Sequence, residues 1–213
     1  GLDIQFGRIY RYLKENGLEE NTLVVLSADH GEMMGSHARM SKNVWYEEAL
    51  HIPLMIRQKG RLIPREVKTL FASPDHMPTV LELLGLPVPE TCEGYSHAKG
   101  ILTGKDENAP EDMFICSYPG EAEMVAAYAK KGMTHKAYGW RGIKTERYTY
   151  VCYNGYEPGE TPHEWLYDSQ PDYYEMSPAE IAPDCMDARI LGFRKRLREY
   201  LDQQGDPFLF RGV

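Results

Sequence analysis

The sequence predicts an α/β fold followed by a smaller α+β region, in which an antiparallel sheet carries a packed helix. Three observations support this prediction: short apolar runs alternate with helical patterns early in the chain, aromatic runs follow one another later, and a long amphipathic segment lies near the end. The 213 residues are 42% apolar and 26% charged, which is sufficient for one large or two small cores. A disordered chain is thereby excluded.

The early elements are typical of a helix followed by two parallel strands. Apolar residues recur at helical spacing over residues 2–13. Residues 22–27 are apolar and rich in β-branched side chains, as expected for a strand covered on both faces of a parallel sheet. Residues 53–57 predict a second strand. The segment between the strands, with a short helix at residues 46–50, is long enough for a crossover connection.

A third strand and a capped helix are predicted next. Residues 67–72 are the strand candidate. Ser73, Pro74 and Asp75 then supply a cap, a first-turn proline and a first-turn acid, and apolar residues follow at helical spacing up to Gly85.

The segment 86–110 is rich in Pro and Gly and is typical of a loop at a domain boundary. We therefore expect two domains. Residues 1–97 would be part of an α/β catalytic domain, and residues 98–213 would form the smaller subdomain.

Beyond this boundary the sequence favours an antiparallel sheet. Residues 113–117, 143–153 and 164–168 are aromatic and β-branched runs without helical patterns between them. The amphipathic segment 187–204 predicts a helix that packs on this sheet.

Composition disfavours two classes of partner. The chain has 24 basic and 32 acidic residues, a net charge of −8, and no dense run of Lys and Arg that would neutralise nucleic-acid phosphates. No apolar run approaches the roughly 18 residues that a membrane helix needs. We expect neither a nucleic-acid partner nor a membrane partner.

The best candidate for a functional site follows the first predicted strand. Asp29 and His30 lie at its carboxyl end, where open α/β sheets bind ligands, and Gly31 would let the backbone turn so that both side chains reach one cation. The alternative is that Asp29 caps a turn and His30 is a buried structural histidine. Lys42 lies a short distance further on, either as a surface charge or as the point charge that holds an anionic ester.

Several ordered segments resemble the C-terminal portion of a type I sulfatase of the alkaline-phosphatase superfamily. They are NTLVVLSADHGEMMGSH at residues 21–37, Lys42, YEEALHIPLMIR at residues 46–57, DHMPTVLELLGLPVP at residues 75–89, WRGIKTERY at residues 140–148, and Leu166, Tyr167, Asp168, Asp172 and Glu175. The resemblance implies that the α/β region is the remnant of a mostly parallel alkaline-phosphatase-like sheet. It also implies hydrolysis of aryl or carbohydrate sulfate esters.

The resemblance also implies roles for individual residues. Asp29 and His30 would bind the active-site divalent cation, which is calcium in most sulfatases, and Lys42 would contact the sulfate group. His37 would take part in catalysis through the substrate or a metal ligand, with a structural role as the alternative. Arg141 and Lys144 lie where the subdomain would approach substrate, but a surface role at a strand edge is favoured.

The nucleophile of the family does not occur in this sequence. It is a formylglycine made from the first residue of a Cys-x-Pro-x-Arg or Ser-x-Pro-x-Arg motif, and no Cys or Ser of the chain begins such a motif. Asp172-Tyr173 also replaces the usual Asp-Pro. We therefore expect this chain to be a fragment, inactive alone, whose missing N-terminal half supplies the formylglycine and further metal ligands.

Two alternatives to sulfate-ester hydrolysis stay open at this point. A phosphodiester or phosphonate monoester hydrolase of the same superfamily would share the Asp-His pair. A non-catalytic binding or scaffold domain with a sulfatase-like fold would keep the framework without the reaction, although the presence of Asp29, His30 and Lys42 argues against it.

Overall fold

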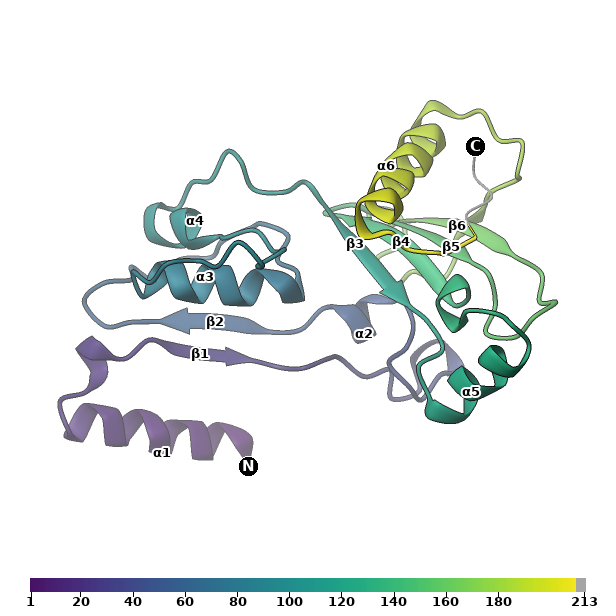
Figure 1. The fold of residues 1–213 in the computed structure, drawn as a ribbon. Coiled ribbons are helices and arrows are strands. Elements are labelled where there is room, and N and C mark those ends of the chain that lie inside the picture. The colour runs from purple at the N-terminus through teal and green to yellow at the C-terminus, as the bar shows by residue number, and fades with distance from the viewer. Residues whose placement is uncertain (210–213) are drawn as a thin grey trace. The chain divides into compact units, whose positions relative to one another are not determined.

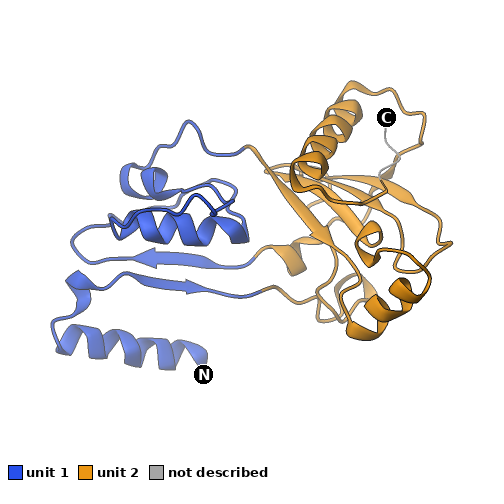
Figure 2. Ribbon diagram, viewed as in Figure 1, with its two compact units in different colours: residues 1–29, 52–110 blue, residues 30–51, 111–213 orange. Residues whose placement is uncertain are grey.

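A computed structural model describes residues 1–209, which form two compact units (Figure 2). Unit 1 comprises residues 1–29 and 52–110, and unit 2 comprises residues 30–51 and the chain from residue 111 onwards. The units are discontinuous because the segment 30–51 packs with the second half of the chain. The predicted domain boundary at residue 97 stays a prediction, since compactness alone does not identify independently folding domains.

Unit 1 combines helices with a two-stranded sheet (Figure 1). Its elements are α1 (Leu2–Glu15), η1 (Glu19–Asn21), β1 (Val24–Ser27), β2 (Leu54–Arg57), η3 (Ser73–Asp75), α3 (His76–Leu83) and α4 (Ala98–Thr103). The predictions of an initial helix and of a helix after residue 72 are confirmed. The predicted cap by Ser73 is wrong, because Ser73 lies in η3 and its side chain does not cap the helix. The strand predicted over residues 67–72 is wrong, and α4 lies in the segment predicted as loop.

The two strands of unit 1 pair antiparallel, with Val24 opposite Arg57 and Ser27 opposite Leu54. The predicted parallel pairing is therefore wrong for these strands. The connection between the strands leaves the C-terminal end of β1, passes through unit 2, and enters β2 at the same end of the two-stranded sheet. An antiparallel pair needs no crossover connection. Burial alternates along β1, and Val25 is 37% exposed, so the prediction of burial on both faces also fails among the described residues.

Asp75 joins the turn before α3 to the segment that leads into α4. Its carboxylate accepts hydrogen bonds from the backbone N–H groups of Ala72 and Tyr95, both at 2.7 Å. It also lies 3.2 Å from Nε2 of His97, and both side chains are buried. The Ala72 N–H group is thus used in a turn instead of a strand ladder, which accounts for the missing third strand.

Unit 2 contains a five-stranded antiparallel sheet in the order β3-β4-β5-β6-β7. The strands are β3 (Asp112–Ser117), β4 (Trp140–Thr145), β5 (Tyr148–Tyr153), β6 (His163–Asp168) and β7 (Ala179–Glu180). The helices are α2 (Glu47–Leu50), α5 (Ala122–Lys130) and α6 (Ala188–Gln204), with 3-10 turns η2 (Ser36–Ala38) and η4 (His135–Ala137). The predicted antiparallel sheet with a packed C-terminal helix is confirmed, whereas α5 was not predicted.

The sheet of unit 2 has an apolar cluster on each face. One cluster joins Ile143, Tyr150 and Cys152 of the sheet to Leu197 and Leu201 of α6. The other cluster joins Ile115, Trp140, Val151 and Tyr167 to Trp45 of the segment 30–51. Side chains alternate across a strand, so β5 sends Tyr150 towards the helix and Val151 towards Trp45. The segment that follows Asp29 is therefore part of the core of unit 2.

The helices in the described part of the chain are too short or too polar to cross a membrane.

The packing of α6 predicts a large effect of one substitution. Leu197 is fully buried, so Leu197→Ala should lower the free energy of unfolding by about 2–5 kcal/mol, through lost burial and the cavity left behind. Urea unfolding measures this change. Lys195 lies on the same helix with its side chain 81% exposed, and Lys195→Ala should change the free energy by less than about 0.5 kcal/mol. Equal effects of the two variants would contradict the packing of α6.

Candidate active site

Asp29 and His30 directly follow β1, as the sequence predicts, and both are exposed. Asp29 is the last residue of the first segment of unit 1, and His30 is the first residue of unit 2. Nδ1 of His30 lies 2.7 Å from the carbonyl oxygen of Gly31. A neutral imidazole that donates its Nδ1 proton to this carbonyl carries its lone pair on Nε2, which is then the nitrogen able to bind a metal.

Gly31 is required by a close approach of two backbone segments. Its N–H donates to the carbonyl of Ala49 at 3.0 Å, and the N–H of Glu32 donates to the carbonyl of Glu48 at 2.9 Å. A Cβ atom at Gly31 would lie 1.9 Å from the Glu48 carbonyl oxygen, so no other residue fits without a shift of the backbone. The structure gives a different reason for this glycine from the expected turn that would let Asp29 and His30 reach one cation: the close contact with α2.

The donor set of Asp29 and His30 suits a divalent cation but does not complete a site. A carboxylate oxygen and an imidazole nitrogen both bind divalent metals, whereas calcium takes about six to eight oxygen ligands. Among the described residues no group of three or more His, Cys, Asp or Glu side chains is arranged to hold a metal ion. The pair therefore fits a metal as part of a larger ligand set.

His37 packs against the rest of unit 2. Its ring stacks on Tyr46 with centroids 3.8 Å apart and an angle of 10° between the planes, and its side chain is 8% exposed. Nε2 lies 3.9 Å from a carboxylate oxygen of Glu48. The backbone of His37 is left-handed, as is that of Met34 and Ala38, a conformation that non-glycine residues adopt at a cost. His37 thus has clear structural contacts, and its catalytic role stays a proposal.

Lys42 is exposed and makes no hydrogen bond or ion pair with the residues that the structure describes. It stands just before the buried residues Val44 and Trp45. The indole N–H of Trp45 donates to the hydroxyl oxygen of Tyr167 at 2.9 Å, and burial raises the pKa of that tyrosine. The ammonium group of Lys42 therefore extends from a well-anchored segment into solvent.

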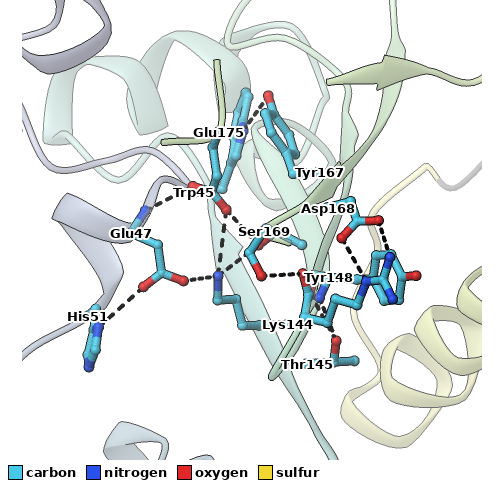
Figure 3. Close-up of polar contacts among 12 residues, drawn as sticks. Trp45, Glu47, His51, Lys144, Thr145, Tyr148, Tyr167, Asp168, Ser169 and Glu175 are labelled. Carbon is cyan, nitrogen blue, oxygen red and sulfur yellow. Dashed lines mark hydrogen bonds and ion pairs between the residues drawn. The ribbon is translucent and has the colours of Figure 1, made fainter. Parts of the chain in front are cut away.

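Lys144 lies between two carboxylates (Figure 3). It forms an ion pair with Glu47 of α2 and lies 3.6 Å from Glu175, and it donates a hydrogen bond of 2.8 Å to the hydroxyl oxygen of Thr149. Its side chain is only 13% exposed. The favoured interpretation of Lys144 as a surface charge is wrong.

Glu175 is the buried carboxylate beside Lys144, and its sequence context gave no indication of this role. It is 3% exposed and accepts hydrogen bonds from the hydroxyl of Thr149 at 2.9 Å and from the backbone N–H of Glu47 at 3.1 Å. These hydrogen bonds offset part of the hydration that the carboxylate loses on burial. Glu175 and Lys144 together bind α2, and hence the segment that carries His37 and Lys42, to the sheet of unit 2.

Comparison with known proteins identifies the family. The sulfatase family model matches residues 2–86. Over 183 residues the chain is 34% identical to an endo-4-O-sulfatase of Bacteroides thetaiotaomicron, an alignment that covers 83% of this chain and 35% of that protein. The chain belongs to the sulfatase family. The matched residues 2–86 contain Asp29, His30, His37 and Lys42.

Solved structures agree with membership in the sulfatase family and its superfamily. A putative sulfatase from Bacteroides fragilis superposes with a TM-score of 0.79 and 30% identity over 100% of this chain and 42% of that one. The phosphonate monoester hydrolase of Agrobacterium radiobacter superposes with a TM-score of 0.77 and 29% identity over 97% of this chain and 40% of that one. The sulfatase-family chain thus spans about a third of the length of its curated relative.

Arg141 of this sulfatase-family chain lies in the core of unit 2. It is fully buried, it binds both carboxylate oxygens of Asp206 at 2.7 and 3.1 Å, and its guanidinium lies over the ring of Phe208. A surface role at a strand edge is therefore wrong for Arg141 too.

The Glu175 network gives a prediction about stability. Glu175→Gln removes the charge that faces Lys144 while keeping the size of the side chain, so the free energy of unfolding should fall by about 1–3 kcal/mol. Denaturant unfolding at neutral pH measures the change. Glu146→Gln, at an exposed position of the same unit, is the control and should change the free energy by less than about 0.5 kcal/mol. Unchanged stability of Glu175→Gln would contradict the assigned network.

Proposed function

We propose that the protein hydrolyses sulfate esters. The observation that supports this most strongly is that one sulfatase-family segment holds a carboxylate, an imidazole and an exposed lysine, at Asp29, His30 and Lys42. Aryl or carbohydrate sulfates are the proposed substrate class. The endo-4-O-sulfatase relative supports sulfate-ester chemistry over other ester classes.

Asp29 and His30 are the proposed metal ligands. Asp29 offers carboxylate oxygens, and His30 offers Nε2 because its Nδ1 faces the Gly31 carbonyl. A divalent cation, calcium in this proposal, would neutralise sulfate oxygens and lower the pKa of the nucleophile. The two side chains would hold the cation and transfer no proton, and further ligands would come from outside this sequence.

Lys42 would bind the sulfate group directly. Its ammonium is a compact charge on a flexible stem, exposed and not paired within the described part of the chain. Such a charge stabilises the negative charge that builds up on the sulfate and on the bridging oxygen as the ester bond breaks. His37 is proposed to support this end of the site through its contacts with Tyr46 and Glu48.

The nucleophile is proposed to be a formylglycine outside this sequence. Sulfatases generally use this residue, and the chain has no motif from which it is made. Turnover would therefore require the intact protein, and the 213-residue chain alone should be inactive.

Hydrolysis of phosphonate monoesters is a second candidate. The structural similarity to a phosphonate monoester hydrolase supports it. It is favoured less, because both the family model and the relative that aligns over most of the chain are sulfatases.

Substitution of Lys42 tests the proposed reaction. In the intact protein, Lys42→Ala should lower kcat for an aryl or carbohydrate sulfate by about 10²–10³-fold, because one group that stabilises transition-state charge is lost. Sulfate release measures turnover, and the melting temperature should change little since Lys42 is exposed. Lys195→Ala should leave kcat unchanged. Undiminished kcat in Lys42→Ala would rule out the proposed role, and preferential turnover of a phosphonate monoester would favour the second candidate.

The metal ligands are tested without an activity assay. The intact protein, freed of loose ions by gel filtration, should retain a divalent metal that elemental analysis detects. Asp29→Asn should lower the retained metal at least tenfold, because an anionic ligand becomes neutral. Asp202→Asn, at an exposed position of α6, should retain the metal as the unchanged protein does. Equal metal content in the two variants would contradict the assignment of Asp29.

A further inference from the structure

Lys42 needs a defined position if it is to hold an anion, and its exposed, flexible side chain does not fix that position by itself. A free lysine side chain has many rotamers and loses conformational entropy when it is fixed. Residues 38–43 are all exposed, and the last backbone hydrogen bonds before Lys42 are those that join Arg39 to Gly35 and Ser36. The nearest restraints on Lys42 lie on its C-terminal side, beginning with the next residue.

The carbonyl oxygen of Asn43 is held by two side chains from distant parts of unit 2. The indole N–H of Trp140, the first residue of β4, donates to it at 3.2 Å. The hydroxyl of Tyr156, in the loop after β5, also lies within hydrogen-bond distance at 3.2 Å. Two donors to one carbonyl occupy both of its lone pairs and fix the orientation of the peptide group between Asn43 and Val44, one residue beyond Lys42.

Both donors are themselves firmly placed. Trp140 is 1% exposed and belongs to the apolar cluster that contains Trp45. The backbone of Tyr156 is bound on both sides, because its N–H donates to Glu160 at 2.9 Å and its carbonyl accepts from the hydroxyl of Tyr128. The hydroxyl of Tyr156 also lies 3.2 Å from that of Ser117, and when Ser117 donates its own proton to Tyr156, the single hydroxyl proton of Tyr156 goes to the Asn43 carbonyl.

The anchor continues beyond Asn43. Val44 is 9% exposed and packs with Met33 and Ala49, and Trp45 is 5% exposed in the cluster on the sheet. The exposed segment thus ends abruptly at Lys42 and Asn43, where the chain becomes fixed. Lys42 is thus an exposed cation that stands directly before a carbonyl with two hydrogen-bond donors and before two buried side chains. A preorganised anion contact requires such a fixed backbone next to an accessible charge.

We propose that Trp140 and Tyr156 are positioning residues for Lys42, and that they act by holding the Asn43 carbonyl. This inference rests on the proposed function, in which Lys42 binds the sulfate group. Neither residue would touch the substrate. Their effect on the reaction would pass entirely through the backbone next to Lys42.

A double-mutant cycle in the intact protein tests whether Tyr156 acts through Lys42. Tyr156→Phe removes one hydroxyl and should lower kcat about tenfold with little change in KM or in the melting temperature. In a Lys42→Ala background the same substitution should change kcat less than twofold, because the group that it positions is gone. Equal losses in both backgrounds, or no loss in either, would overturn the proposal.

Tyr200→Phe is the matched control. Tyr200 also donates its hydroxyl to a partner within unit 2, Asp112 at 2.9 Å, but it lies on α6 and does not contact Asn43. It should leave kcat unchanged. A loss as large as that of Tyr156→Phe would show a general effect of weakened packing and would overturn the proposal.

NMR order parameters separate this inference from the proposed function. In Tyr156→Phe and in Trp140→Phe, the order parameters of the backbone amides of residues 42–44 should fall from about 0.85, typical of rigid backbone, towards about 0.6, whereas Tyr200→Phe should leave them unchanged. If Lys42→Ala has full activity, the proposed function fails, while lower order parameters still support the anchor. Unchanged order parameters in both variants would overturn the anchor whatever the activity.

Discussion

The packing of Trp45 on the sheet of unit 2 is the contact on which the candidate site depends most. Trp45 belongs to a cluster with Ile115, Trp140, Val151 and Tyr167, and its indole donates to Tyr167. These residues are far from Trp45 in sequence. Because the tryptophan is buried, the segment from His30 to His51 is held by the second half of the chain, although it directly follows a strand of unit 1.

Three buried charged residues of unit 2 differ in their surroundings from the proposed site residues. Glu175, Arg141 and Arg194 are buried, and each has charged or hydrogen-bonding partners that offset the loss of hydration. Asp29, His30 and Lys42 are exposed instead. A metal ligand or an anion contact must stay accessible, so this exposure agrees with the roles proposed for the three residues.

Buried and half-buried polar side chains connect the sheet of unit 2 to the segment with Lys42. Glu175 and Lys144 bind α2, while Trp140 and Tyr156 bind the Asn43 carbonyl. The segment with Lys42 is therefore bound at both α2 and Asn43 to the same sheet. A site that takes its remaining ligands from another part of a protein gains from such a rigid support, because preorganisation reduces the entropy lost on binding.

The sequence alone determined the elements with strong local signals: the amphipathic helices α1 and α6, the helix α3, and the aromatic strands of unit 2. It also singled out Asp29 and His30, because adjacent polar residues after an apolar strand are a local feature, and the roles of these residues and of Lys42 stay predictions. It missed α5 and α4, which are short and lie near Pro and Gly residues that favour loops.

Tertiary structure alone decided the direction of β2, the burial of Arg141 and Lys144, and the role of Glu175. Each of these depends on partners distant in sequence: β2 pairs antiparallel because residues 30–51 belong to the other unit, and Lys144 is buried because α2 covers it. Local patterns specify what a segment forms and which chemistry it carries. Which partner a charge or a strand meets is fixed by long-range packing, because the free energy of burial depends on the whole set of contacts and not on neighbours in sequence.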